Sequence, residues 1–209
     1  PYRVISFFND ITKNSFGNVS FARYLKFLYF NLPFVNLFKK NGFRLNLSQS
    51  YYQEINLKKK GVKSKRLNDF IQKDFFLKAK KIDLKKKENL ICYNPLKSSE
   101  FMKRIIKHNS DFKFVPLINL TISEVIDILS KSKIYMDFGF HPGVDGLPRE
   151  SAILKNCIIT NKEGSAYYSK AVPISKKYKF EEKKKNLIKI RNLIKKIFKN
   201  HQVELQNFK

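Results

Sequence analysis

Short apolar segments alternate with helical patterns through the second half of the chain, and this alternation limits the fold more than any other property. The apolar segments lie at 90–93, 112–115, 134–138 and 157–160. Helical patterns fill the intervals at 98–108, 121–131 and 148–155, and Thr121 with Glu124 makes the residue pair of a capping box. Strands joined by helices of this length predict βαβ units with right-handed crossovers. We therefore predict an α/β protein built on a Rossmann-like parallel sheet with helices on both faces.

A charged segment divides the chain into parts. Residues 78–88 are rich in Lys and lack a regular apolar period, so we interpret them as a linker. Residues 1–77 are predicted to form an incomplete N-terminal α/β domain, with strands at 2–8 and 43–47 and helices within 21–38 and 49–60. Residues 89–180 are predicted to form the regular domain, and 181–209 an amphipathic helix and tail. Because the chain begins at Pro1 and the first domain is short, we expect that an N-terminal part is missing.

The composition combines a large positive charge with enough apolar residues for a core. Lys and Arg number 43 against 17 Asp and Glu, a formal net charge of +26, while 43% of the residues are hydrophobic. That apolar content excludes a wholly disordered chain. The two cysteines, Cys92 and Cys157, exclude a disulfide framework and a four-ligand zinc site. The apolar stretch at 27–38 contains Pro33 and is too short to span a bilayer of about 30 Å.

The positive charge suits two kinds of binding partner, nucleic acid and anionic membranes. Lys and Arg that neutralise phosphates bind nucleic acid without sequence preference. The lysines are spread through every segment, however, and no zinc-finger spacing or RNP motif occurs, so we disfavour nucleic acid as the main partner. A basic surface also attracts the anionic cytoplasmic leaflet of a membrane. We therefore expect a cytoplasmic protein with peripheral contact to the inner face of the cytoplasmic membrane.

Three loops at the carboxyl ends of the predicted strands carry residues that suit a ligand. In an open α/β sheet, ligands bind beyond these ends, where loops meet helix N-termini. Glycines there let backbone amides approach a phosphate, while a nearby cation can bind a diphosphate and a carboxylate can bind a ribose diol. The candidate residues for binding such a ligand are Asn94, Lys97, Gly139, Gly143, Arg149, Glu150, Gly164 and Ser165. Together they predict a site for a nucleotide diphosphate.

Each of these residues also has a purely structural interpretation. The glycines can simply allow tight loops, Glu150 can complement a helix dipole, and Lys97 can be an ordinary surface lysine. His141, with an ordinary pKa of about 6.5, can donate to a phosphate or act as a base. Asp145 is a second candidate catalytic residue, and Asp137 is expected to hold the loop from the end of its strand. The residues leave the structural and the functional interpretations open.

Four segments together resemble the donor-binding half of group 1 GT-B glycosyltransferases. They are DFGFHPG at 137–143, LPRESA at 147–152, CIIT at 157–160 and GSA at 164–166. They are most similar to a little-characterised bacterial group with D-F-G-x-H-P-G and P-R-E-A-A segments, often encoded near surface-polysaccharide genes. LSQSYY at 47–52 is similar to that group's N-terminal half, and VPI at 172–174 to its tail. The resemblance implies a GT-B fold with residues 1–77 on the acceptor side and 89–180 on the donor side.

The resemblance also implies roles for single residues. Glu150 matches the second glutamate of the superfamily's paired-glutamate motif, which is expected to bind ribose. Pro142 occupies the position of the first glutamate, so His141 or Asp145 is expected to do part of that work as a catalytic residue. Lys97 lies where the superfamily often places a cation on the diphosphate. Arg149 is expected to assist this cation or to pair with the neighbouring glutamate.

The function that the resemblance implies is a hexosyltransferase-type glycosyltransferase. It would move a sugar from a nucleotide-diphosphate donor to a cell-surface glycan or a lipid-linked acceptor. The nucleotide-sugar is then a substrate, and neither a cofactor nor a metal is expected, since no Asp-x-Asp pair occurs. The alternative is a non-catalytic Rossmann-like module that binds nucleic acid or an anionic membrane through its basic surface.

Overall fold

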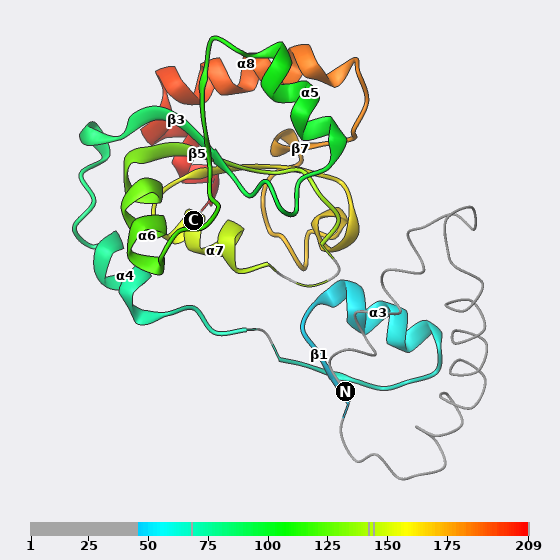
Figure 1. Cartoon of the computed structure of the whole chain (residues 1–209). Coiled ribbons are helices and arrows are strands. Elements are labelled where there is room, and N and C mark those ends of the chain that lie inside the picture. The colour runs from blue at the N-terminus through cyan, green and yellow to red at the C-terminus, as the bar shows by residue number, and fades with distance from the viewer. Residues whose placement is uncertain (1–45, 68, 142, 144, 209) are drawn as a thin grey trace. The chain divides into compact units, whose positions relative to one another are not determined.

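The computed structural model describes residues 46–67, 69–141, 143 and 145–208 (Figure 1). The strand predicted at 2–8, the helices predicted within 21–38 and most of the strand predicted at 43–47 lie outside the described residues. The chain forms two compact units, residues 1–68 and residues 69–209. Each unit is described separately below as the first and the second unit.

The segment predicted as a linker, 78–88, lies inside the second unit. Helix α4 (Lys73–Ala79) ends in this segment, the 3-10 turn η2 (Leu84–Lys86) lies within it, and strand β3 begins at its last residue. Phe75 and Ile82 pack into a hydrophobic core, whereas the lysines at 80 and 81 are exposed. The many lysines of this segment obscured its apolar residues. The predicted boundary between the two domains therefore lay too far along the chain.

The first unit contains a small parallel strand pair. Helix α3 (Tyr51–Lys59) connects β1 (Leu47–Ser48) to β2 (Lys65–Arg66), and the two strands pair in parallel. The helix begins after Ser50, whose hydroxyl accepts a hydrogen bond from the amide of Gln53 at 3.2 Å. The helix predicted at 49–60 is therefore confirmed.

Five parallel strands form the sheet of the second unit, in the order β4-β3-β5-β6-β7. Parallel pairing joins each neighbouring pair. The strands are β3 (Glu88–Tyr93), β4 (Lys113–Pro116), β5 (Ser132–Asp137), β6 (Cys157–Asn161) and β7 (Lys179–Phe180). The α/β class, the parallel sheet and the four predicted strands are confirmed. Strand β7 was not predicted, because two residues are too few to show an alternating pattern.

Helices connect and follow these strands. They are α5 (Glu100–His108), α6 (Ile122–Lys131), α7 (Gly146–Ile153), α8 (Asn186–Lys199) and α9 (His201–Glu204), with 3-10 turns η3 (Gly164–Tyr167), η4 (Lys176–Tyr178) and η5 (Leu205–Phe208). The predicted capping box is present: the Thr121 hydroxyl accepts from the Glu124 amide at 3.3 Å, and the Glu124 carboxylate accepts from the Thr121 amide at 2.7 Å. Among the described residues, no helix is long and apolar enough to cross a membrane.

Each face of the sheet has its own hydrophobic core, because successive strand residues point to opposite sides. In β3, Ile91 packs with α5 and α8, whereas Cys92 packs with α4 and α6 on the other face. Figure 1 shows these helices on the two sides of the sheet. Cys92 and Cys157 are both buried and free, and burial raises their thiol pKa values to about 11 and about 12. Both act as small core residues.

Candidate functional site

The order of the strands selects one edge of the second unit for a ligand. The chain runs from β3 through α5 to β4 on one side, and after α6 it returns to β5 on the other side of β3. The connections that leave β3 and β5 therefore lead to opposite sides of the sheet. This reversal of direction is where open α/β sheets bind ligands, at the carboxyl ends of the two strands. The turn at 94–97 follows β3 there, and the loop that starts at residue 138 follows β5.

Gly139 is the point at which this turn and this loop touch. A Cβ atom on Gly139 would lie 2.0 Å from the carbonyl oxygen of Lys97, which is far inside van der Waals contact. Beside it, the amide of Ser99 donates a hydrogen bond to the carbonyl of Phe138 at 2.6 Å. A side chain at residue 139 would therefore force the two segments apart.

His141 is buried in the loop between two carboxylates. Its Nε2 lies 2.8 Å from Asp137 Oδ1, and its Nδ1 lies 2.7 Å from Asp145 Oδ2. The Nε2 contact is an ion pair without the alignment of a directional hydrogen bond. Asp145 also accepts from Lys97 Nζ, at 2.9 and 3.0 Å from its two oxygens. The structure thus brings Lys97, from the turn after β3, together with His141 and Asp145, from the loop after β5.

The charges of these groups depend on one another. Burial lowers the pKa of His141, but the interactions with the Asp137 and Asp145 carboxylates outweigh it and raise that pKa to about 9. Burial raises the pKa of Asp145, but His141 and Lys97 outweigh it and lower that pKa to about 2. At neutral pH the imidazole is therefore an imidazolium with both nitrogens protonated. A protonated imidazole does not act as a base, and both of its nitrogens face carboxylates of the protein, so neither role considered for His141 applies directly.

The 3-10 turn η3 supports the loop from the side. The amide of Ser165 donates to the carbonyl of His141 at 2.8 Å. Gly164 has a φ of 53°, and a Cβ atom there would lie 2.3 Å from the same carbonyl oxygen. The residues of η3 at 164–166 are buried. Gly164 and Ser165 therefore position the loop, and the Ser165 amide is already used within the protein.

Asn161, at the end of β6, contacts the same loop. Its Nδ2 donates to the carbonyl of Gly139 and to Glu182 Oε1, both at 2.8 Å. Glu182 Oε1 also accepts from the Ser99 hydroxyl at 2.9 Å. The Oδ1 atom of Asn161 is buried and has no hydrogen-bond partner among the described residues. An unpaired buried acceptor costs about 1–3 kcal/mol, so this enclosed oxygen lowers the stability of the edge.

Glu150 lies in α7 and is half-buried. Burial raises the pKa of its carboxyl group, and the charge of Arg149 lowers it by less. A Cβ atom on Gly146 would lie 3.3 Å from Glu150 Oε1, so the carboxylate lies beside the first residue of the helix. Arg149 donates from Nη1 to the carbonyl of Asp69 at 2.9 Å, so its guanidinium is oriented toward that segment.

Asn94 and Gly143 complete the predicted set. The Asn94 side chain accepts from the Leu96 amide at 3.0 Å, and its carbonyl accepts from the Ser98 hydroxyl at 2.7 Å. Both bonds shape the turn that presents the lysine at 97. Gly143 is half-buried, between two residues that lie outside the described ones.

Two further residues of this edge, Asn161 and Glu182, were not singled out from the sequence. No motif marks them, because their contacts with Gly139 and Ser99 join segments that are far apart along the chain. Among the described residues, no group of three or more His, Cys, Asp or Glu is arranged to hold a metal ion. Comparisons with protein-family models, with curated proteins and with solved structures found no match for this chain.

Proposed function

We propose that this protein is a glycosyltransferase of GT-B type whose second unit binds a nucleotide-diphosphate sugar at the carboxyl edge of the sheet. The observation that carries the proposal is the placement of Lys97 there, at the reversal point between β3 and β5, in an exposed ion pair with Asp145. In this proposal the sheet is the Rossmann-like donor half, and residues 1–68 belong to the acceptor side.

A diphosphate would bind by exchanging the partner of Lys97. The Lys97 side chain is 53% exposed, against 24% for Asp145, so the ammonium is the mobile member of the pair. Exposed ion pairs contribute only about 0–1 kcal/mol, so a doubly or triply charged diphosphate can compete for the ammonium. Asp145 keeps its charge when the lysine leaves, because His141 still contacts it. In the proposed reaction, Lys97 stabilises the negative charge that develops on the departing diphosphate as the glycosidic bond breaks.

The ribose needs a hydrogen-bond acceptor, and one is present. Glu150 is a half-buried carboxylate in α7, and it can accept two hydrogen bonds from a ribose diol. An acceptor of this kind supports a ligand that carries a diol.

His141 and Asp145 act through position and charge in this proposal. The imidazolium links Asp145 of the loop to Asp137 at the end of β5, and it adds a fixed positive charge at this edge of the sheet. The low pKa of Asp145 makes that carboxylate a weak base. We therefore assign to this pair the preorganisation of the loop and of Lys97. The proposed acceptor is a cell-surface glycan or a lipid-linked sugar at the inner face of the cytoplasmic membrane.

Thermal unfolding of the full chain with UDP, GDP, ADP or CMP tests the donor site. A ligand at about 100 times its dissociation constant adds about 2.7 kcal/mol of stability. For a chain of this size, that gain raises the melting temperature by about 5–10 °C. We expect one nucleotide to produce this shift at about 150 mM salt, and Glu150→Gln and Lys97→Gln each to remove most of it.

Matched variants serve as controls. Glu88→Gln and Lys113→Gln make the same chemical changes at the exposed amino-terminal ends of β3 and β4, and they should keep the full shift. A site made by one lysine and one carboxylate should also keep most of its shift between about 50 and 200 mM salt, whereas binding through many phosphates should weaken steeply. The absence of a shift with every nucleotide, or an equal loss in the control variants, would contradict the proposal.

A further inference from the structure

One face of helix α4 and its flanking residues exposes large apolar side chains beside lysines. Phe70 is 85% exposed, Phe76 48% and Leu77 46%. At 100° per residue, Phe76 and Leu77 lie about 100° and 200° around the helix from Phe75, the residue of α4 that is buried in the core, and Phe70 precedes the helix. Three exposed lysines lie on the same side. We define the α4 outer face as Phe70, Lys73, Phe76, Leu77, Lys80 and Lys81.

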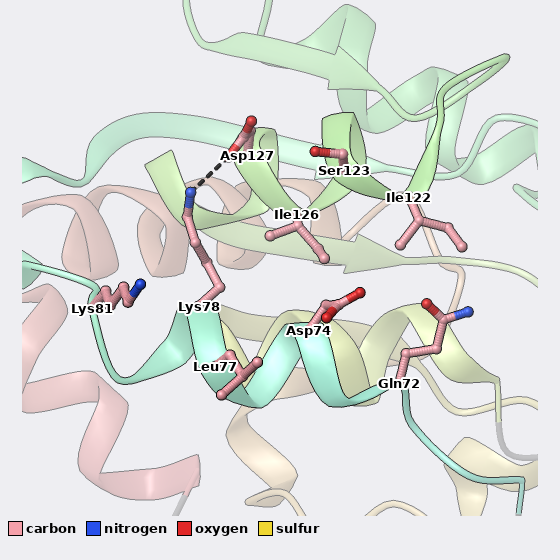
Figure 2. Close-up of a pocket in the computed structure, with 9 residues that line it drawn as sticks. All are labelled: Gln72, Asp74, Leu77, Lys78, Lys81, Ile122, Ser123, Ile126 and Asp127. Atoms are coloured by element: carbon pink, nitrogen blue, oxygen red, sulfur yellow. Dashed lines mark hydrogen bonds and ion pairs between the residues drawn. The ribbon is translucent and has the colours of Figure 1, made fainter.

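The helix that presents this face is held firmly in the second unit. Phe75 is buried in the core on its inner side, together with Ile126 of α6. Lys78 Nζ forms an ion pair with Asp127 Oδ1 at 2.7 Å, across a groove of about 390 Å³ between α4 and α6 (Figure 2). The exposure of Phe76 and Leu77 is therefore a property of a packed helix.

Charge decides among the surfaces that could cover this face. A second copy of the chain carries a net charge of +26, and residues 1–68 hold 13 Lys and Arg against two Asp and Glu. Both would bring like charges against Lys73, Lys80 and Lys81, and like charges repel. An anionic bilayer attracts these ammonium groups and also offers an apolar layer for aromatic side chains. Lys81 lies at the rim of the groove and has no carboxylate partner among the described residues.

We propose that the α4 outer face docks the protein on an anionic lipid bilayer. Phe70, Phe76 and Leu77 enter the boundary between the headgroups and the acyl chains, and the three lysines contact the anionic headgroups. The inference goes beyond the proposed function and does not depend on it, since α4 contributes no side chain to the donor site described above. It would give the enzyme direct access to a lipid-linked acceptor.

Co-sedimentation of the full chain with vesicles tests the inference. The probes are vesicles of phosphatidylcholine, with and without about one quarter phosphatidylglycerol. We expect strong binding to the anionic vesicles only. Phe76→Ser with Leu77→Ser should weaken binding about tenfold or more, and so should the triple change of Lys73, Lys80 and Lys81 to Gln. Phe70→Ser, outside the helix, should weaken binding even if the paired substitution disturbs α4.

Control variants make the same changes elsewhere in the second unit. One control, Ile188→Ser with Val203→Ser, replaces two exposed apolar residues of α8 and α9. The other control removes three exposed charges by changing Lys184, Lys185 and Lys189 to Gln. Both controls should keep most of the binding. An equal loss in the controls would overturn the inference, because binding would then follow total charge. Self-association of the chain without vesicle binding would also overturn it. The nucleotide-induced shift should be unchanged in the α4 variants, which separates this inference from the proposed function.

Discussion

At the scale of single residues, His141 shows how a buried cation can hold a loop. The ring lies between Asp137 and Asp145 and is 5% exposed, so its positive charge has little contact with water. The two carboxylates replace that solvation, and they would repel each other without it. The stability of the loop therefore depends on the protonation of one imidazole.

The substitution His141→Gln should destabilise the protein by about 3 kcal/mol at pH near 6, because it leaves two partly buried carboxylates without their shared cation. Urea-induced unfolding of the full chain measures this change. His108→Gln is the matched control: His108 is the exposed last residue of α5, and its loss should change the free energy of unfolding by about 0.5 kcal/mol or less. Equal effects of the two substitutions would show that the ion pairs contribute nothing.

The same variant should reveal a dependence on pH. The pKa of His141 is raised from 6.5 to about 9 on folding, so its contribution is fully present below pH 6.5 and is lost as the pH rises through 9. The gap in unfolding free energy between wild type and His141→Gln should shrink by about 3 kcal/mol between these values. Burial lowers the pKa of Lys87 to about 7, which gives the opposite slope, but this contribution cancels in the difference. A gap that is constant from about pH 6 to pH 9.5 would contradict the assigned charge.

At the scale of elements, the site depends on the contact between the turn after β3 and the loop after β5. Gly139 makes this contact possible, and Asn161 and Ser165 anchor the loop from β6 and η3. Each of these segments follows a neighbouring strand, so the parallel order of the sheet brings them to one edge.

Gly139→Ala should separate the turn from the loop and move Lys97 away from Asp145. A methyl group 2.0 Å from a backbone carbonyl forces movement of the backbone, so we expect a loss of about 2 kcal/mol or more in unfolding free energy and loss of the nucleotide-induced shift. Gly146→Ala is the control, because its nearest neighbour is the flexible Glu150 side chain at 3.3 Å. Alanine favours a helix by about 1 kcal/mol over glycine, so this variant should be neutral or slightly more stable. Similar melting curves for both variants would show that the contact is not close.

At the scale of the whole molecule, the chain consists of two units with separate sets of internal contacts. The second unit holds the complete five-stranded sheet, both hydrophobic cores and the proposed donor site. A unit with its own sheet and cores is expected to fold independently.

A protein that contains only residues 69–209 should therefore fold and unfold cooperatively. Circular dichroism during urea unfolding should show a single transition, with a slope of about 1–3 kcal/mol per molar urea. If the donor site lies within this unit, the nucleotide that stabilises the full chain should stabilise the fragment to a similar extent. A gradual, non-cooperative transition would show that the second unit depends on residues 1–68.

Local spacing in the sequence was enough to predict the elements that build the second unit. Short apolar segments predicted β3 to β6, helical patterns predicted α5 to α8, and Thr121 with Glu124 predicted the start of α6. These patterns depend on neighbours within a few residues, so they can be recognised without knowledge of the fold. Alternation of strands and helices then led to the parallel sheet.

Contacts between distant segments could not be obtained in this way. The unit boundary before residue 69, the edge strand β7 and the position of Glu182 beside Ser99 and Asn161 depend on which segments pack together. The residue types at His141 and Asp145 suggested chemistry, but their charges follow from burial and from the carboxylate on the far side of the ring. Sequence spacing thus predicted which elements form, while the order of the strands determined which side chains meet, because long-range contacts form only when the sheet assembles.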